Sequence, residues 1–198
     1  MIVIDVETSG IDPKKNSIVS IGAIDFPNPK NSFYAECRIW NGSEINSEAL
    51  KINGFSIMNI TSPEKPSLEE IIRNLLMWTE NIKDRTIAGI NPFFDRDFLR
   101  ESCKRCNIKY PFGDRIVDLH SLCYADYLRR GKEPLIMNGR TAIDSKRLFE
   151  YVGLPEEPRP HNAKTGAEME AEAFSRIIYG ENLLEPYAKY PIPYYLII

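Results

Sequence analysis

The sequence predicts a three-layer α/β domain with a mixed five-stranded sheet and helices on both faces. Three β-rich segments come first: a strand that ends at Ser9-Gly10, followed by 17–26 and 32–40. Short Pro- and Asn-containing links join them and suit antiparallel neighbours, because a parallel crossover needs about a dozen residues or more. After residue 67, helical and strand patterns alternate, as parallel βα units require. Composition agrees, since 43% of the 198 residues are hydrophobic and 27% are charged, which is ordinary for one globular domain.

The segment "SLEEIIRNLLMW" begins the first long helix. Ser67 at the N-cap and Glu70 three residues later form a capping box, and apolar residues recur behind it at helical spacing. A strand, "RTIAGI" (85–90), then leads into a helix that starts at "NPFFD". There Asn91 suits the N-cap and Pro92 suits the first helical position.

The C-terminal half continues this alternation. The segment "DRIVDLHSLCYADYLRR" (114–130) predicts a strand that leads into a helix, 131–143 is expected to be irregular, and 144–154 predicts another helix. A long helix that begins near "HNAKTGA" closes the domain, which we place at residues 1–180. The apolar, Pro-broken tail, 181–198, is expected to dock on the domain, with a partner-binding peptide as the alternative.

Charge and hydropathy argue against two classes of protein. The net charge of −3 disfavours a protein that coats long duplexes by neutralising phosphates, although a nucleic-acid enzyme can draw positive charge from bound metal ions. No apolar run approaches the ~20 residues of a membrane helix, and Met1 leads directly into a strand, so we expect no membrane association and a cytoplasmic location. Cys103 and Cys106 form a CxxC within a helical pattern, where small buried thiols are expected.

Two carboxylates interrupt the otherwise apolar first strand. Side chains alternate along a strand, so Asp5 and Glu7 share one face, roughly 7 Å apart. Left unpaired there, they would repel one another and lose hydration. A third acid, Asp95, lies in the first turn of the helix after Asn91. Either it interacts favourably with the helix dipole, or it lies close to Asp5 and Glu7 at the ends of adjacent strands. In the second case the three acids offer the oxygen ligands that Mg²⁺ or Mn²⁺ prefers.

These acids belong to segments that resemble the motifs of a known superfamily. The segment "IDVETSG" resembles the first motif of the DEDDh 3′–5′ exonucleases, the superfamily of the proofreading subunit of bacterial replicative DNA polymerase and of oligoribonuclease. "NPFFD" (91–95) is similar to their second motif and "HNAKTGA" (161–167) to their third, in the same order across residues 1–178. The resemblance implies a ribonuclease-H-like fold with the first three strands antiparallel, two divalent ions, and nucleic acid as partner, as single-stranded 3′ ends of DNA or RNA.

The resemblance also implies catalytic roles for individual residues. Asp5, Glu7 and Asp95 correspond to metal ligands, and His161 corresponds to the general base. A histidine with a reference pKa of about 6.5 is mostly neutral at pH 7 and accepts a proton from water. Two ions roughly 4 Å apart activate the water and stabilise charge on the leaving oxygen.

Four residues are expected beside the bound strand. Thr8 corresponds to a position next to the terminal nucleotide. Ile11 lies where the family often has an apolar residue between the last bases, with strand-end packing as its alternative. Asn91 opens the second motif, and Arg130 lies in a basic segment that either tracks phosphates or forms a solvated face.

One position departs from the third motif. The family has an aspartate, the fourth metal ligand, five residues after the histidine, whereas this chain has Gly166. Glu170 lies one helical turn later and leans toward the N-terminus over the space at Gly166, so it is the candidate replacement ligand. Glu168 and Glu172 are expected to face solvent. The alternative is a site impaired by a natural or engineered glycine, which leaves a nucleic-acid-binding module on the same fold.

Overall fold

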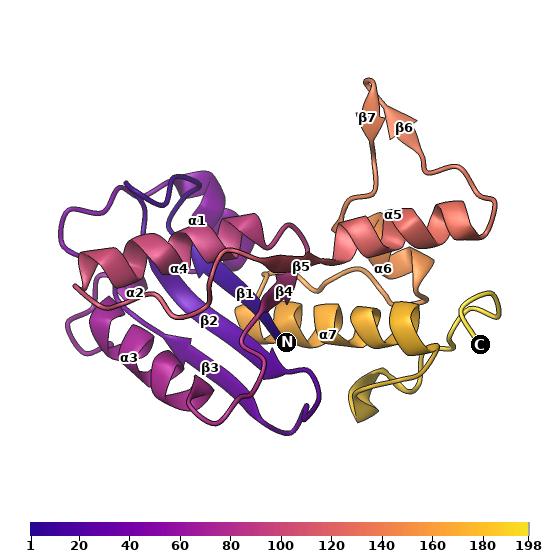
Figure 1. Ribbon diagram of the computed structural model, residues 1–198. Coiled ribbons are helices and arrows are strands. Elements are labelled where there is room, and N and C mark those ends of the chain that lie inside the picture. Colours follow the sequence, from indigo (N-terminus) through magenta and orange to yellow (C-terminus); the bar gives the residue numbers. More distant parts are fainter. Residues whose placement is uncertain (198) are drawn as a thin grey trace.

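The computed structural model describes residues 1–197 and has helices on both faces of a sheet (Figure 1). Within these residues the main sheet has five strands in the order β3-β2-β1-β4-β5. They are β1 (Ile2–Thr8), β2 (Ile18–Asp25), β3 (Ser32–Glu36), β4 (Ile87–Gly89) and β5 (Ile116–Asp118). β1, β2 and β3 pair antiparallel, whereas β4 is parallel to β1 and β5 is parallel to β4. The predicted mixed sheet is confirmed, including its antiparallel first three strands.

Two strands are shorter than their apolar patterns predicted. β3 ends at Glu36 rather than at residue 40, because the backbone N–H of Arg38 donates to the carbonyl of Pro66, outside the sheet (2.9 Å). β4 also falls short of its predicted span, and it pairs only with Ile2 and Val3 of β1. The second half of β1 is therefore not paired with β4.

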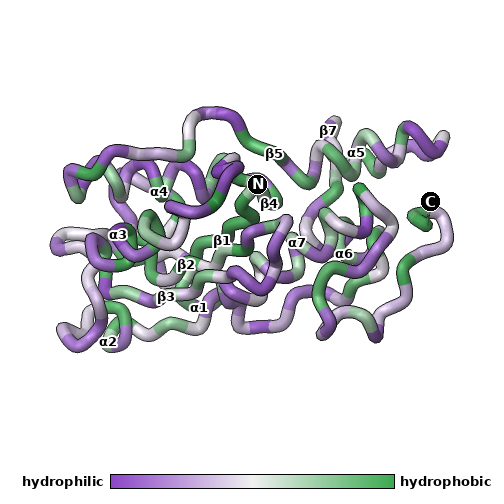
Figure 2. The backbone as a smooth tube through the Cα atoms, turned by 60° about the horizontal axis from the view of Figure 1, so that its bottom comes forward, coloured by the Kyte–Doolittle hydropathy of each residue, from purple (hydrophilic) through white to green (hydrophobic). Residues whose placement is uncertain are grey.

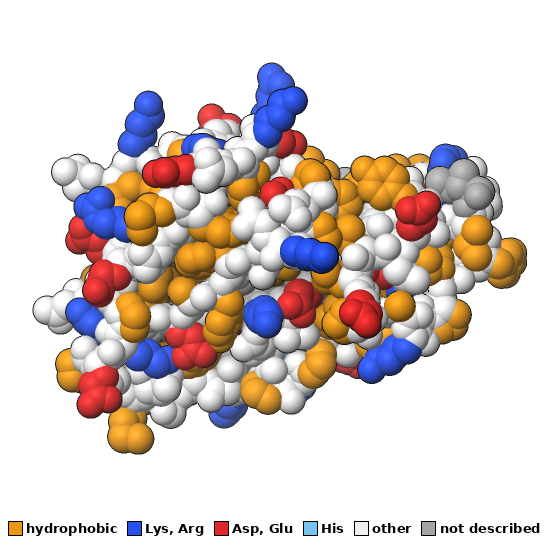
Figure 3. All heavy atoms as spheres, turned by 90° about the horizontal axis from the view of Figure 1, so that it is seen from below, with side chains coloured by type: hydrophobic (Ala, Val, Ile, Leu, Met, Phe, Trp, Pro, Cys, Tyr) orange, Lys and Arg blue, Asp and Glu red, His pale blue; other side chains and the backbone are white. Residues whose placement is uncertain are grey.

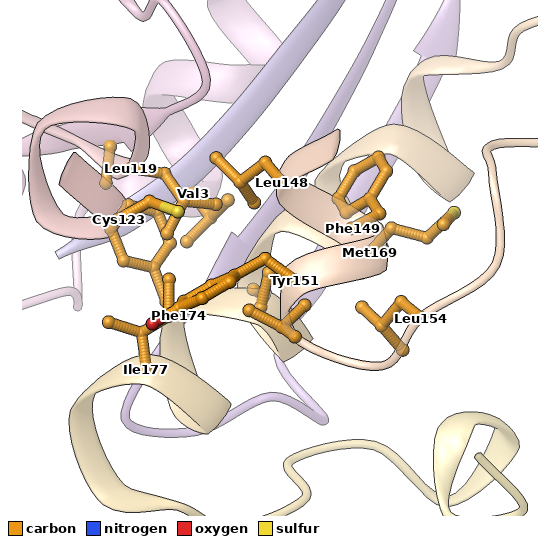
Figure 4. Close-up of a cluster of buried hydrophobic side chains, with 14 of the residues drawn as sticks. Val3, Leu119, Cys123, Leu148, Phe149, Tyr151, Leu154, Met169, Phe174 and Ile177 are labelled. Atoms are coloured by element: carbon orange, nitrogen blue, oxygen red, sulfur yellow. The ribbon is translucent and has the colours of Figure 1, made fainter. Parts of the chain in front are cut away.

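Two hydrophobic clusters hold the layers together. The helices are α3 (Leu68–Thr79) and α4 (Phe93–Arg105) on one side, and α5 (Leu119–Arg129), α6 (Ser145–Tyr151) and α7 (Ala163–Tyr179) on the other. The hydrophobic stretches of β1 and β4 lie between them in the middle of the molecule (Figure 2). Ile2, Ile4 and Val6 of β1 pack toward α3 and α4, whereas Val3 packs toward α5, α6 and α7 (Figure 4). Two short helices, α1 (Ser47–Asn53) and α2 (Ile57–Ile60), pack on β2 through Leu50 and Ile60.

The start of α4 differs from its prediction, whereas the capping box before α3 is present as predicted. α4 begins at Phe93 with Pro92 at the N-cap and no side-chain cap, so Asn91 is not the N-cap. Asn91 adopts φ of 54°, and its backbone N–H donates to Asp118 Oδ1 (3.3 Å). The chain therefore turns sharply between β4 and α4, which takes the Asn91 side chain away from the first turn.

A β-hairpin lies in the segment 131–143, which was expected to be irregular. β6 (Ile136–Met137) and β7 (Arg140–Thr141) pair antiparallel, and the two residues between them, Asn138 and Gly139, have φ of 52° and 75°. An Asn-Gly pair with positive φ at both positions is the preferred two-residue hairpin turn. Strands of two residues are too short to show the alternation of apolar and polar residues that predicts a strand. The hairpin projects from the body of the molecule (Figure 1).

The C-terminal tail lies against α6 and α7 and contains a short 3₁₀ helix, η1 (Glu185–Tyr187). Arg176 of α7 is fully buried and donates to the carbonyl oxygens of Tyr187 and Tyr190 in the tail, both at 3.0 Å. Glu172 does not face solvent as expected. It is fully buried because it pairs with Arg176 (2.8 Å) and is covered by the returning tail.

Two further features concern the surface and the thiols. Among the described residues, no helix has the length and apolarity needed to cross a membrane. The four cysteines are free; Cys103 is buried, as expected, and Cys106 is partly exposed.

Candidate active site

β1 directs two carboxylates toward α7. By strand alternation, Asp5 and Glu7 lie on the same face as Val3, the face covered by α5, α6 and α7. Asp5 reaches the helix itself: a Cβ atom built at Gly166 would lie only 2.2 Å from Asp5 Oδ2. The glycine therefore leaves the space that the Asp5 carboxylate occupies.

Asp95 approaches the same part of β1 from the first turn of α4. Its side chain is buried, and Oδ1 accepts a hydrogen bond from the backbone N–H of Val6 (2.9 Å). That N–H is available because β4 pairs only with the first residues of β1. The hydrogen bond holds the Asp95 carboxylate close enough to Asp5 and Glu7 for their charges to interact.

Glu170 of α7 brings a fourth carboxylate to this group. Its side chain is 8% exposed, and Oε2 has no hydrogen-bond partner among the described residues. A Cβ built at Gly89, the last residue of β4, would lie 2.9 Å from this oxygen, so the carboxylate lies against the end of β4. In this position its charge acts on Asp5, and the charge of Asp95 acts on it.

Burial and mutual repulsion oppose ionisation of these acids. Burial raises the pKa of Glu7 to about 7, with the charge of Glu157 contributing, and it raises the pKa of Asp95 to about 7 despite backbone hydrogen bonds. Burial also raises the pKa of Asp5 and of Glu170 well above their usual ranges, and the charges of the neighbouring acids add to the effect. A divalent cation relieves such repulsion, and an all-oxygen donor set suits Mg²⁺ or Mn²⁺. The residues present therefore offer the donor chemistry of a divalent metal site.

His161, just before α7, faces an acid that the sequence analysis did not single out. His161 Nδ1 lies 3.4 Å from Glu157 Oε2, and Glu7, Glu157 and His161 each place a ligand atom within 4.8 Å of the others. The backbone N–H of His161 donates to the carbonyl of Ile52 in α1 (2.9 Å), which anchors the histidine at this end of the sheet. The only signal for Glu157 is its spacing, four residues before the histidine in "PEEPRPH", and a loop without periodicity does not reveal where its side chains point.

Two clefts border Glu7 and His161. One, of about 250 Å³, is lined by residues that include Glu7, Thr8 and Ile11; the other, of about 330 Å³, is lined in part by His161. Asn53 of α1 lines both clefts, and its side chain donates to the Thr8 carbonyl (3.0 Å). Thr8 is buried, whereas Ile11 is 80% exposed. This exposure contradicts strand-end packing of Ile11 and leaves its side chain free at the cleft.

Two predicted substrate contacts are not among the residues that line these clefts. Arg130 follows the far end of α5, roughly 18 Å along the helix from Asp118. Its Nε binds Asp126 (2.7 Å), so its charge is used within the fold rather than offered to a strand at the acids. Asn91 is exposed, and its backbone rather than its side chain makes the contact with Asp118.

Comparison with known proteins agrees with these motifs. The sequence profile of the Exonuclease family, RNase_T, matches residues 2–174. Ribonuclease T of Haemophilus influenzae is 29% identical over 128 residues, which cover 57% of this chain and 56% of that protein. The chain thus spans little more than half the length of the curated relative it matches.

Two solved structures have the same fold. E. coli Exonuclease I superposes with a TM-score of 0.70 at 17% identity, over 87% of this chain and 39% of that one. The nuclease domain of 3′hExo, a DEDDh family member, superposes with a TM-score of 0.68 at 14% identity, over 97% of this chain and 94% of that one. The predicted ribonuclease-H-like fold is confirmed by these likenesses. Because the family profile covers nearly the whole of the folded domain, the chain belongs to the Exonuclease (RNase_T) family.

Proposed function

We propose that the chain is a metal-dependent 3′–5′ exonuclease that removes nucleotides from single-stranded ends of nucleic acid. The observation that carries the proposal is the position of three acids at one end of β1. The charges of Glu7 and Asp95 act on Asp5, and Glu7 also lies near His161. Family membership supports it. E. coli Exonuclease I is known in complex with a dT13 oligonucleotide, and the 3′hExo domain is known bound to rAMP.

The acids and the histidine have different roles in the proposed reaction. Asp5, Glu7 and Asp95 hold the divalent cations, which supply Lewis acidity toward the phosphate when bound. His161 accepts the proton of the attacking water as the water oxygen bonds to phosphorus. The bond between phosphorus and the 3′-oxygen breaks, and the departing oxygen takes a proton from solvent. General-base assistance of this kind is typically worth ~10²–10⁴-fold in rate.

Glu157 positions the general base. Its Oε2 faces His161 Nδ1 at 3.4 Å, which favours the tautomer with the proton on Nδ1 and leaves Nε2 free to accept. A base whose second nitrogen faces a carboxylate is held in orientation, as in other base–orienter pairs. Glu157 is thus a positioning residue in this proposal.

The clefts account for a preference for ends. The cleft beside Glu7 has room for a terminal nucleotide, and the exposed Ile11 side chain offers an apolar surface to its base. On the face shown in Figure 3, Lys and Arg are interspersed with Asp and Glu rather than gathered into a basic stripe. This face therefore offers no continuous basic track for a strand.

A 5′-labelled oligonucleotide with a single-stranded 3′ tail tests the proposal. We expect a ladder that shortens from the 3′ end in Mn²⁺ or Mg²⁺, and no ladder in EDTA or with a 3′-phosphorothioate cap. DNA and RNA strands of the same sequence, run in parallel, report the preferred sugar. Strand binding without a ladder in either metal would favour the second candidate, a non-catalytic binding module. The observation behind that candidate is Gly166, which stands where the resembling family has a metal-ligand aspartate. Shortening from the 5′ end would contradict the proposed direction.

A further inference from the structure

Position 166 of α7 has no side chain where the resembling family has a metal ligand, and the structure reveals what occupies the space. A Cβ at Gly166 would lie 2.2 Å from Oδ2 and 2.9 Å from Cγ of Asp5, closer than such atoms approach one another. The Asp5 carboxylate fills the volume in which a side chain at 166 would begin. While Asp5 holds this position, no acid at 166 has room.

Glu170 lies one turn further along the same side of α7. Residues four apart on a helix lie one above the other, and their side chains lean toward the N-terminus. The additional methylene of glutamate lengthens this reach, so a carboxylate at 170 extends back toward Asp5. The Glu170 carboxylate indeed lies at the inner end of β4, against Gly89, rather than at the surface.

The contacts around Glu170 leave one oxygen of its buried carboxylate unpaired. Oε2 is without a hydrogen-bond donor among residues 1–197. The ion pairs described on α7 join Glu168 to Lys164 and Glu172 to Arg176, and Glu170 takes part in neither. The charges next to it include Asp95 and Asp5. A backbone hydrogen bond from Ile90 reaches the carboxylate, but Oε2 stays unpaired. A buried carboxylate is costly unless its charge is balanced, and a bound metal ion would balance it.

We propose that Glu170 is the fourth metal ligand of this chain, moved by one helical turn from the position that Gly166 occupies. This inference rests on the proposed function and adds a residue to it. Gly166 and Glu170 form a matched pair, because the glycine makes room for Asp5 and the glutamate supplies the carboxylate that the glycine lacks. An impaired site would not need to retain a buried acid among other acids.

Titration of the metal-free protein with Mn²⁺, followed by the EPR signal of the free ion, tests the ligand role without substrate. We expect two bound ions in the wild type, and at least about tenfold weaker binding of one of them in Glu170→Gln. Glu168→Gln is the matched control, since this carboxylate lies on the same helix beside Lys164 (3.9 Å). The control is expected to bind Mn²⁺ like the wild type. Equal Mn²⁺ affinities in Glu170→Gln and the wild type would overturn the inference.

Gly166→Asp distinguishes a relocated ligand from a missing one. Alone, it forces an acid into the space of Asp5, so we expect weaker Mn²⁺ binding than in the wild type. Combined with Glu170→Ala, which vacates volume into which Asp5 can move, it is expected to restore part of the binding that Glu170→Ala loses. If Gly166→Asp alone binds Mn²⁺ more tightly and cleaves faster than the wild type, the site lacks a ligand and the inference is wrong.

The two proposals fail in different ways. A wild type that binds no Mn²⁺ and yields no ladder contradicts the exonuclease proposal and the ligand assignment together. A wild type that binds and cleaves, with Glu170→Gln unchanged in both, contradicts the ligand assignment alone. The melting temperature of metal-free Glu170→Gln serves as the folding check. We expect it to equal or exceed that of the wild type, because the variant replaces an acid whose ionisation is disfavoured by burial with a neutral amide of the same shape.

Discussion

Glu170 and Glu172 lie two residues apart on α7, and both are buried, but their surroundings are opposite. Glu172 accepts a hydrogen bond from Arg176 Nε and from the backbone N–H groups of Leu183 and Leu184, each at 2.8 Å. Glu170 has an oxygen without any partner among the described residues, and it lies among other acids. Buried polar groups are nearly always satisfied. The hydrogen-bonded Glu172 carboxylate therefore stabilises the fold, whereas the unpaired oxygen of Glu170 indicates a ligand that binds to the folded protein.

One side of α7 therefore contributes to stability, and the other side contributes to function. Positions two apart on a helix lie roughly 200° apart around its axis, so one helix faces two environments. On one side, the Glu172–Arg176 pair holds the tail to the domain. On the other, the repulsion among Glu170, Asp5 and Asp95 costs the metal-free protein stability and creates its affinity for cations.

The largest effect is expected on the tail side. Glu172→Ala leaves the Arg176 guanidinium buried without its carboxylate, so we expect the free energy of unfolding to fall by about 3–5 kcal/mol. Urea denaturation measures the change. A loss below about 1 kcal/mol, as for an exposed ion pair, would break the comparison by showing that the tail holds without this pair.

On the cation side, Asp5→Asn is expected to reduce activity without harming the fold. Removal of a ligand should lower the cleavage rate at least about 100-fold. The metal-free melting temperature should not fall, because the repulsion from Glu170 and Asp95 is relieved. Initial rates on the 3′-tailed oligonucleotide and thermal melts provide the two measurements. If stability falls together with activity, Asp5 acts like Glu172 and the contrast between the two sides fails.

A smaller effect sharpens the comparison at the edge of the site. Glu157→Gln keeps the shape of the side chain but removes the charge that faces His161 Nδ1. We expect kcat to fall about tenfold with KM unchanged, because orientation of the base is lost while the clefts are intact. Steady-state kinetics separates the two parameters, with the exposed Glu133→Gln as a surface control. A change in KM alone would assign Glu157 to strand binding instead.

The last effect is a pH dependence of the metal-free protein. Burial raises the pKa of Glu7 from 4.5 and of Asp95 from 3.8 to about 7 in the folded state. The folded state therefore holds protons that the unfolded state has lost, and this contribution to stability declines as pH rises from about 4 to about 7, then levels off. We expect the melting temperature to fall over this range, and Mn²⁺ to offset the fall near pH 7. A Glu7→Gln/Asp95→Asn double variant with the same pH slope would assign the slope to other groups.

Much of the architecture could be predicted because it depends on neighbours along the chain. The capping box of Ser67 and Glu70, the short links between the first three strands and the glycine cap of α7 at Gly180 (φ 68°) all involve residues a few positions apart. The hairpin and the early end of β3 could not be predicted in this way. The hairpin has two-residue strands, and β3 ends because Pro66 competes for a backbone hydrogen bond from 28 positions further along the chain.

The candidate site likewise has features that could be predicted from the sequence and features that could not. Strand alternation placed Asp5 and Glu7 on one face, and motif order brought Asp95 and His161 to them. The burial of Glu172 was missed because the tail that covers it returns from residues that no helical pattern connects to it. Arg130 lies at the far end of α5, a position that nearness in sequence to an irregular segment does not indicate.

By itself, the sequence determined the strands of the main sheet and the long helices, the face on which the first two acids lie and the family to which the chain belongs. The tertiary structure decided what each carboxylate meets: Glu172 meets the returning tail, Glu170 keeps Oε2 without a partner in residues 1–197, and Asp5 fills the space at Gly166. The physical reason is that periodicity reports only the direction of a side chain from its own backbone. What the side chain meets there depends on segments that are distant in the chain and become neighbours only when the layers pack.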